Sequence, residues 1–93
     1  MNSTVCIIAH RGASADAPEN TLPAFNLAWD MRADGIEGDF RLTADGQVIC
    51  IHDATTKRVA EINLPIESTD YAQLRTVNVA HAFNANGPPA HIP

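Results

Sequence analysis

The first apolar positions of the chain form an unbroken run. Residues 5–9 read Val-Cys-Ile-Ile-Ala, and His10, Arg11 and Gly12 follow. A short continuous apolar run is typical of a strand buried on both faces, and the glycine and small residues after it favour a loop. We therefore expect a buried strand that leads into a loop at His10.

The next segment has apolar residues at helical spacing. The apolar positions that share one face of the predicted helix are Leu22, Phe25, Ala28 and Trp29. Asn20 and Thr21 are the candidate N-caps, and Pro23 lies in the first turn, where proline is tolerated. The helix should end near Ala33, with Gly35 just beyond it.

Two alternating segments then follow, at 36–42 and at 47–52, with a turn at 43–46 between them. Alternation with a period of two predicts strands. A connection of four residues is too short for a parallel crossover, so the two strands should be antiparallel. A bulge at Gly46 would shift their pairing by one residue.

The pairing of these strands decides which polar side chains meet. If Leu42 lies opposite Gln47, then His52 lies opposite Glu37, further along the ladder. Directly opposed residues share a face of a sheet. This register would place Glu37, Asp39 and His52 on one surface.

The pattern weakens in the last third of the chain. Ser68 or Thr69 could cap a short helix that carries Tyr71 and Leu74. Residues 84–93 are rich in Asn, Gly and Pro, which predicts a weakly structured tail. The order of strand, helix and hairpin predicts one small α/β domain over residues 1–93.

Composition narrows the class of protein. The chain has 93 residues and a net charge of −5, with eleven acidic side chains against six Lys and Arg. The absence of a basic run excludes a nucleic-acid footprint and gives no attraction to an anionic membrane. No apolar stretch is long enough to span a bilayer or resembles a secretory signal, so we expect a cytoplasmic protein. Cys6 and Cys50 lie in apolar runs without CxxC spacing, which predicts buried free thiols.

Carboxylates and histidines mark the candidate chemistry. Glu37 and Asp39 are two residues apart on a predicted strand, and paired carboxylates suit a divalent cation such as Mg²⁺ or Ca²⁺. The alternative is an ordinary solvated strand face. His10 and His52 each follow an apolar strand, where α/β folds place reactive groups. One such histidine would be structural; two favour an acid and base pair.

The remaining polar residues allow simpler interpretations. Arg11 suits a phosphate or carboxylate oxygen, and its structural alternative is a salt bridge to Glu37 or Asp39. Glu19 belongs to the segment that caps the helix. Arg58 follows Lys57, and both side chains are expected to be solvated in a loop.

Five motifs in order resemble the opening of the glycerophosphodiester phosphodiesterase family. They are His10-Arg11-Gly12, Ala17-Pro18-Glu19-Asn20-Thr21, Glu37-Gly38-Asp39, Leu42-Thr43-Ala44-Asp45-Gly46 and His52-Asp53. The resemblance covers residues 5–58. If the chain were instead a small α/β domain with coincidental motifs, all five motifs would have to arise by chance.

The resemblance implies a fold, a reaction and a role for each residue. The fold is the N-terminal portion of a TIM-type (β/α)8 barrel, and the reaction is metal-dependent hydrolysis of a small-molecule glycerophosphodiester to glycerol 3-phosphate and an alcohol. His10 and His52 would be the general acid and base, Arg11 a phosphate contact, and Glu37 and Asp39 ligands of Mg²⁺ or Ca²⁺.

A complete barrel of this type has about 250 residues, and this chain of 93 would supply only part of one. We therefore expect an incomplete barrel that is inactive by itself and exposes an open sheet edge, through which it could self-associate. The alternative is a non-catalytic truncated remnant or interaction module that keeps half of the site.

Overall fold

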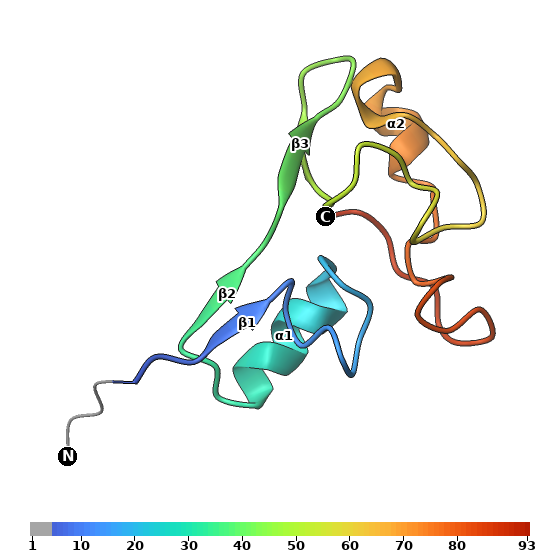
Figure 1. The fold of residues 1–93 in the computed structure, drawn as a ribbon. Coiled ribbons are helices and arrows are strands. Elements are labelled where there is room, and N and C mark those ends of the chain that lie inside the picture. The colour runs from blue at the N-terminus through green and yellow to red at the C-terminus, as the bar shows by residue number, and fades with distance from the viewer. Residues whose placement is uncertain (1–4) are drawn as a thin grey trace.

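The computed structural model describes residues 5–93 as two small sheets with short helices around them. The elements are β1 (Ile8–His10), α1 (Leu22–Asp30), β2 (Gly35–Glu37), β3 (Phe40–Leu42), β4 (Val48–Cys50), the 3₁₀ helix η1 (Ile66–Ser68) and α2 (Tyr71–Leu74). In Figure 1, β1, α1 and β2 lie at one end and β3 and α2 at the other. The arrangement is elongated, with extents of 49 × 31 × 17 Å.

The first unit is a strand, helix, strand crossover. β1 pairs with β2 in parallel, with Ala9 opposite Ile36, and α1 provides the long connection that parallel strands require. Thr21 caps α1 and accepts a hydrogen bond from the Ala24 amide, which confirms one of the two predicted caps. Parallel pairing of neighbouring strands brings their carboxyl ends to one edge.

α1 ends at Asp30, three residues before the predicted end at Ala33. Arg32 takes a left-handed φ of 65°. The amides of Arg32 and Ala33 donate to the carbonyls of Trp29 and Ala28, which is the pattern of a Schellman motif. The helix is therefore closed by Arg32 in the conformation that glycine usually supplies.

The predicted burial of the first strand is wrong. Val5, Ile7 and Ile8 are exposed to 70%, 62% and 54%, and the strand begins at Ile8. Within residues 5–93, β1 has a single neighbouring strand, so the rest of its apolar surface has nothing to pack against. Cys6 is exposed for the same reason, against prediction, whereas Cys50 is buried; both are free thiols.

The apolar face of α1 also differs from the prediction. Leu22 and Trp29 are more than half exposed, while Ala24 and Ala28 are buried. The small side chains of the helix are thus the ones that pack closely, because they allow its backbone to approach the loop after β1.

The antiparallel hairpin is present, with a register one residue away from the predicted one. Leu42 lies opposite Val48 and not opposite Gln47. Gly46 has a φ of +80°, and its amide donates to the Thr43 carbonyl, as in a hairpin turn that ends in a left-handed bulge. The bulge at Gly46 therefore sets the register.

The predicted strand over 36–42 is divided. β2 ends at Glu37 and β3 begins at Phe40, although the two run on in the same direction in Figure 1. The break at Gly38 and Asp39 occurs where the chain changes its partner from β1 to β4. This break is where the candidate site lies.

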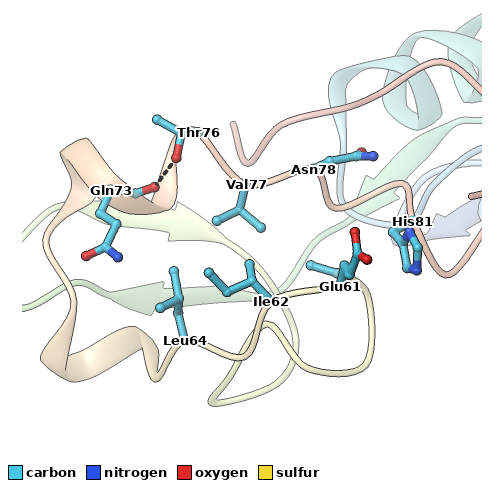
Figure 2. Close-up of a pocket in the computed structure, with 9 residues that line it drawn as sticks. Glu61, Ile62, Leu64, Gln73, Thr76, Val77, Asn78 and His81 are labelled. Atoms are coloured by element: carbon cyan, nitrogen blue, oxygen red, sulfur yellow. Dashed lines mark hydrogen bonds between the residues drawn. The ribbon is translucent and has the colours of Figure 1, made fainter.

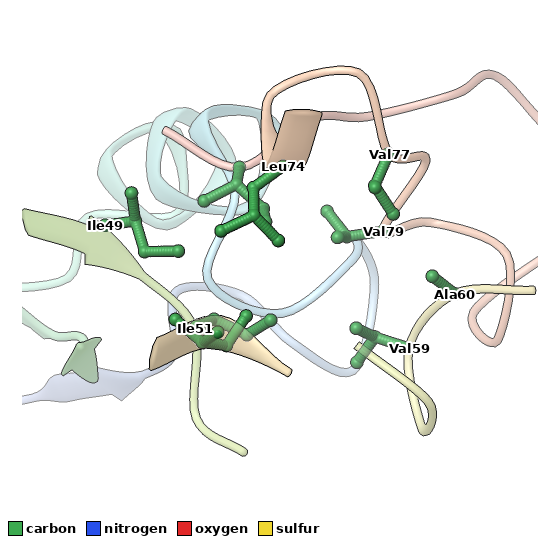
Figure 3. Close-up of a cluster of buried hydrophobic side chains, with 9 residues drawn as sticks. Ile49, Ile51, Val59, Ala60, Leu74, Val77 and Val79 are labelled. Carbon is green, nitrogen blue, oxygen red and sulfur yellow. The ribbon is translucent and has the colours of Figure 1, made fainter. Parts of the chain in front are cut away.

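The main hydrophobic core packs β4 against the C-terminal half of the chain (Figure 3). Its buried members are Ile49, Ile51, Val59, Ala60, Ile66, Leu74, Val77, Val79 and Ile92. The N-cap of α2 is Asp70 and not the predicted Ser68 or Thr69. Residues 84–93 form no helix or strand, yet Ile92 is only 4% exposed. None of the helices in the described part of the chain is long and apolar enough to cross a membrane.

Candidate active site

A tight loop after β1 positions two of the predicted residues. Arg11 and Gly12 both have a positive φ, of 58° and 79°, so the chain reverses directly after His10. The Arg11 amide donates to the Glu37 carbonyl at 2.6 Å. Non-glycine residues with a positive φ are uncommon and often lie at functional sites. The loop holds Arg11 against the end of β2.

His10 and Glu37 form an exposed pair. They are direct neighbours in the parallel ladder, and His10 Nε2 lies 3.4 Å from Glu37 Oε1, with both side chains more than 60% exposed. The prediction that His52 lies opposite Glu37 is therefore wrong, since the hairpin is shifted and Glu37 belongs to the other sheet.

Asp39 lies at the centre of the site. Its Oδ2 is 3.2 Å from Arg11 Nε and accepts a hydrogen bond from Asn20 Nδ2 at 3.1 Å. The Asn20 hydrogen bond, and then the positive charges of His52, Arg11 and His10, lower the pKa of Asp39. Both histidines therefore lie within electrostatic reach of one carboxylate.

Asn20 is a site residue that the sequence interpretation missed. It is only 3% exposed and takes a left-handed φ of 54°. Its Oδ1 accepts from the Asp39 amide and from Cys50 Sγ, both at 3.3 Å, and its own amide donates to the Arg11 carbonyl. Asn20 thus joins the loop after β1, the break between β2 and β3, and β4. The sequence offered one signal for this role, because asparagine tolerates a left-handed backbone better than most residues.

Arg58 is paired, against the prediction that it is solvated. Its Nη1 and Nη2 donate to the two carboxylate oxygens of Glu19 at 2.6 and 2.8 Å, and its Nε donates to Asp53 Oδ2 at 2.8 Å. These hydrogen bonds lower the pKa of Glu19 and raise that of Arg58. Glu19 in turn accepts from Arg11 Nη1 at 3.3 Å.

His52 is held at both its backbone and its ring. Arg41 Nε donates to the His52 carbonyl at 2.9 Å, and His52 Nδ1 lies 2.6 Å from Asp53 Oδ1. Hydrogen bonds from Arg58 and His52 lower the pKa of Asp53 to about 2. Because an ionised carboxylate can only accept, the hydrogen in this contact is on Nδ1. Nε2 is therefore the nitrogen left to exchange a proton.

The charges of the site favour a cation. The guanidinium groups of Arg11 and Arg58 contact the carboxylates of Glu19, Asp39 and Asp53, and the Glu37 carboxylate pairs with His10. Even with the guanidinium of Arg41, which bonds the His52 carbonyl, four carboxylates exceed three guanidinium groups while the histidines are neutral. Glu37 and Asp39 are donors of the kind that Mg²⁺ and Ca²⁺ prefer. However, no three His, Cys, Asp or Glu side chains of residues 5–93 are arranged to hold a metal ion.

A separate cavity lies elsewhere in the described part of the chain. It has a volume of about 540 Å³, and Figure 2 shows Ile62, Leu64 and Val77 beside Glu61 and His81 around it. None of the predicted site residues lines this cavity. The candidate site is instead an open cluster at the ends of the strands.

Comparison with known proteins adds an independent finding. A sequence model of the glycerophosphoryl diester phosphodiesterase family matches residues 10–93. The probable glycerophosphodiester phosphodiesterase 1 of Mycobacterium tuberculosis is 46% identical over 69 residues, which are 74% of this chain and 25% of that protein.

Two solved structures show the same fold over this segment. A glycerophosphodiester phosphodiesterase from Agrobacterium tumefaciens superposes with a TM-score of 0.90 at 36% identity, over 97% of this chain and 39% of that one. A phosphodiesterase from Oleispira antarctica, in complex with the product sn-glycerol-3-phosphate, superposes with a TM-score of 0.89 at 31% identity, over 96% of this chain and 36% of that one. The chain thus spans well under half of each relative.

Proposed function

Because this chain belongs to the glycerophosphoryl diester phosphodiesterase family, we propose that it forms the N-terminal portion of a TIM-type barrel, incomplete here, that hydrolyses glycerophosphodiesters to glycerol 3-phosphate and an alcohol. The observation that carries this proposal is the position of Asp39, which contacts Arg11 and lies within electrostatic reach of His10 and His52. A phosphodiester needs a cation for its anionic oxygens and groups that move protons, and this cluster holds both.

Each residue has a task in the proposed reaction. Arg11 would bind a phosphate oxygen, because its Nη2 has no hydrogen bond within residues 5–93 and a guanidinium matches phosphate geometry. His52, oriented by Asp53, would accept a proton at Nε2, and His10 would protonate the leaving alkoxide. The attacking hydroxyl group gives its proton to His52 as its oxygen bonds to phosphorus. The phosphorus–oxygen bond to the alcohol breaks, and the departing oxygen takes the proton from His10.

A divalent cation, Mg²⁺ or Ca²⁺, is part of this proposal. Glu37 and Asp39 would supply two of its carboxylate ligands, and water, substrate or further carboxylates of a complete barrel would supply the rest. When bound, the cation would act as a Lewis acid on the phosphoryl oxygens.

The second candidate is a non-catalytic remnant or interaction module. The absence of a three-ligand group within residues 5–93 favours it, because half a site can bind weakly without turning over substrate. In either case we place the protein in the cytoplasm and expect a small molecule, not nucleic acid, as its ligand.

We expect the chain to bind glycerol 3-phosphate through Arg11. Arg11→Gln should weaken binding by roughly tenfold or more, because a charge-assisted hydrogen bond contributes about 1.5–3 kcal/mol. Titration with Mg²⁺ present, followed by phosphorus NMR, measures this affinity. The matched control is Arg75→Gln, since Arg75 lies over the Tyr71 ring and outside the cluster. Equal affinities for all three chains would contradict the proposed role of Arg11.

We also propose that the chain self-associates through its open sheet edge. Large apolar side chains are exposed on both sheets, among them Ile8 of β1 and Phe40, Leu42 and Val48 of the hairpin. Exposed strands of this kind pair with other chains. Sedimentation velocity should show a mass that rises with concentration, and Phe40→Lys should shift the distribution toward the monomer. A monomer at every concentration would contradict this proposal.

A further inference from the structure

We infer that Arg58 is a positioning residue of this site, which holds His52 and Arg11 in their working orientations through Asp53 and Glu19. The inference rests on the proposed function, since that function gives His52 and Arg11 their tasks. It adds a residue from a loop that none of the matched motifs contains.

The geometry of the Arg58 fork supports this role. Nη1 and Nη2 donate to the two oxygens of Glu19, while Nε and Nη2 donate to the two oxygens of Asp53, at 2.8 and 3.4 Å. Each carboxylate is thus held by two nitrogens of one rigid plane, which fixes its orientation as well as its distance. These contacts use four of the five N–H donors of Arg58, so its guanidinium is committed to the two carboxylates and not to a substrate phosphate.

Each of these two carboxylates contacts a proposed site residue and restrains its orientation. Asp53 contacts His52 Nδ1 at 2.6 Å, and Glu19 accepts from Arg11 Nη1 at 3.3 Å. His52 is 46% exposed, so little packing restrains its ring on the open side. The orientation of the ring therefore depends on Asp53, and the orientation of Asp53 depends on Arg58.

Arg58 also separates two like charges. The Asp53 carboxylate acts to raise the pKa of Glu19, whereas the hydrogen bond from Arg58 lowers it. Without Arg58, the two carboxylates would repel each other and move apart. His52, which contacts Asp53, and Arg11, which contacts Glu19, would then separate as well. One cation in this place therefore keeps the acid–base residue and the phosphate-binding residue on the same side of the site.

The test compares Arg58→Gln, Arg58→Lys and the control Lys57→Gln, whose parent side chain forms no ion pair within residues 5–93. The first readout is the pKa of Asp53 by carboxyl carbon NMR, which should rise from about 2 toward 3.8 in Arg58→Gln. The second is the set of Hα–Hβ couplings of His52, which report its rotamer. We expect one rotamer in the parent chain and in Lys57→Gln, averaging in Arg58→Gln, and partial recovery in Arg58→Lys.

An unchanged His52 rotamer in a folded Arg58→Gln chain would overturn the inference, even if the pKa of Asp53 rises, because the ion pair would then be structural only. Averaged couplings in the parent chain would overturn it too. Should circular dichroism show Arg58→Gln to be unfolded, Asp53→Ala decides: it keeps the Glu19–Arg58 pair but removes the acceptor that links Arg58 to His52, so a fixed His52 rotamer there refutes the inference. None of these readouts needs ligand or turnover, so failure of the proposed function is recognised separately, by the glycerol 3-phosphate titration.

Discussion

Replacing Gly12 by alanine should destabilise the chain by about 2–4 kcal/mol, from left-handed strain and overpacking together. Gly12 has a φ of +79°, and an added Cβ would lie 2.7 Å from the carbonyl carbon of Ala24 and 2.8 Å from its oxygen. These atoms are α1 backbone, so they cannot turn aside as a flexible side chain can. Urea unfolding followed by circular dichroism measures the loss.

Gly46→Ala is the matched control. Gly46 has nearly the same φ, +80°, but an added Cβ would meet no atom within 4 Å. It should therefore cost only the left-handed strain, about 1–2 kcal/mol. Equal losses at Gly12 and Gly46 would show that the contact with Ala24 contributes nothing.

The second large effect concerns catalysis. The chain alone should not turn over glycerophosphocholine with Mg²⁺ or Ca²⁺, because Glu37 and Asp39 are too few ligands to hold the cation firmly. Placed in the Agrobacterium tumefaciens relative, in exchange for the segment that superposes at a TM-score of 0.90, it should support turnover. In that chimera, His10→Ala or His52→Ala should lower kcat by roughly 10²–10⁴-fold, the usual contribution of a general acid or base.

The control for the chimera is His91→Ala, since His91 is exposed in the tail and should leave kcat unchanged. Turnover by the chain alone that His10→Ala abolishes would contradict the first expectation. A chimera that folds but shows no turnover would favour the non-catalytic alternative. Full activity without either histidine would refute their proposed roles.

The sequence predicted most of the local structure because local structure depends on near neighbours. The helical spacing, the Thr21 cap and the turn before Gly46 are all signals within a few residues. The register was wrong because one left-handed residue, Gly46, adds a bulge that period-two alternation does not report. Burial at Ile8 was wrong because an apolar pattern shows what a strand can bury and not which partners are present.

The candidate site, too, could be predicted only in part. His10, Arg11, Glu37, Asp39 and His52 could be named because strand ends and carboxylate spacing are visible in the sequence. The ion pair of Arg11 with Asp39 was also foreseen, as the structural alternative for Arg11. The pairing of His10 with Glu37 was not, and Arg58 was misread as solvated. Its partner Glu19 lies 39 residues earlier, and no periodicity records a pair at that distance.

That separation has a consequence for the order in which the chain folds. The β3–β4 hairpin joins residues 40–50 and can form within about 1–10 μs, since it closes a short loop. The Glu19–Arg58 pair must close a loop of 39 residues, whose entropic cost grows with the logarithm of its length. The site should therefore assemble late in folding, after both sheets exist. On gentle heating it should also be the first part to come apart, while the hairpin and α1 are still intact.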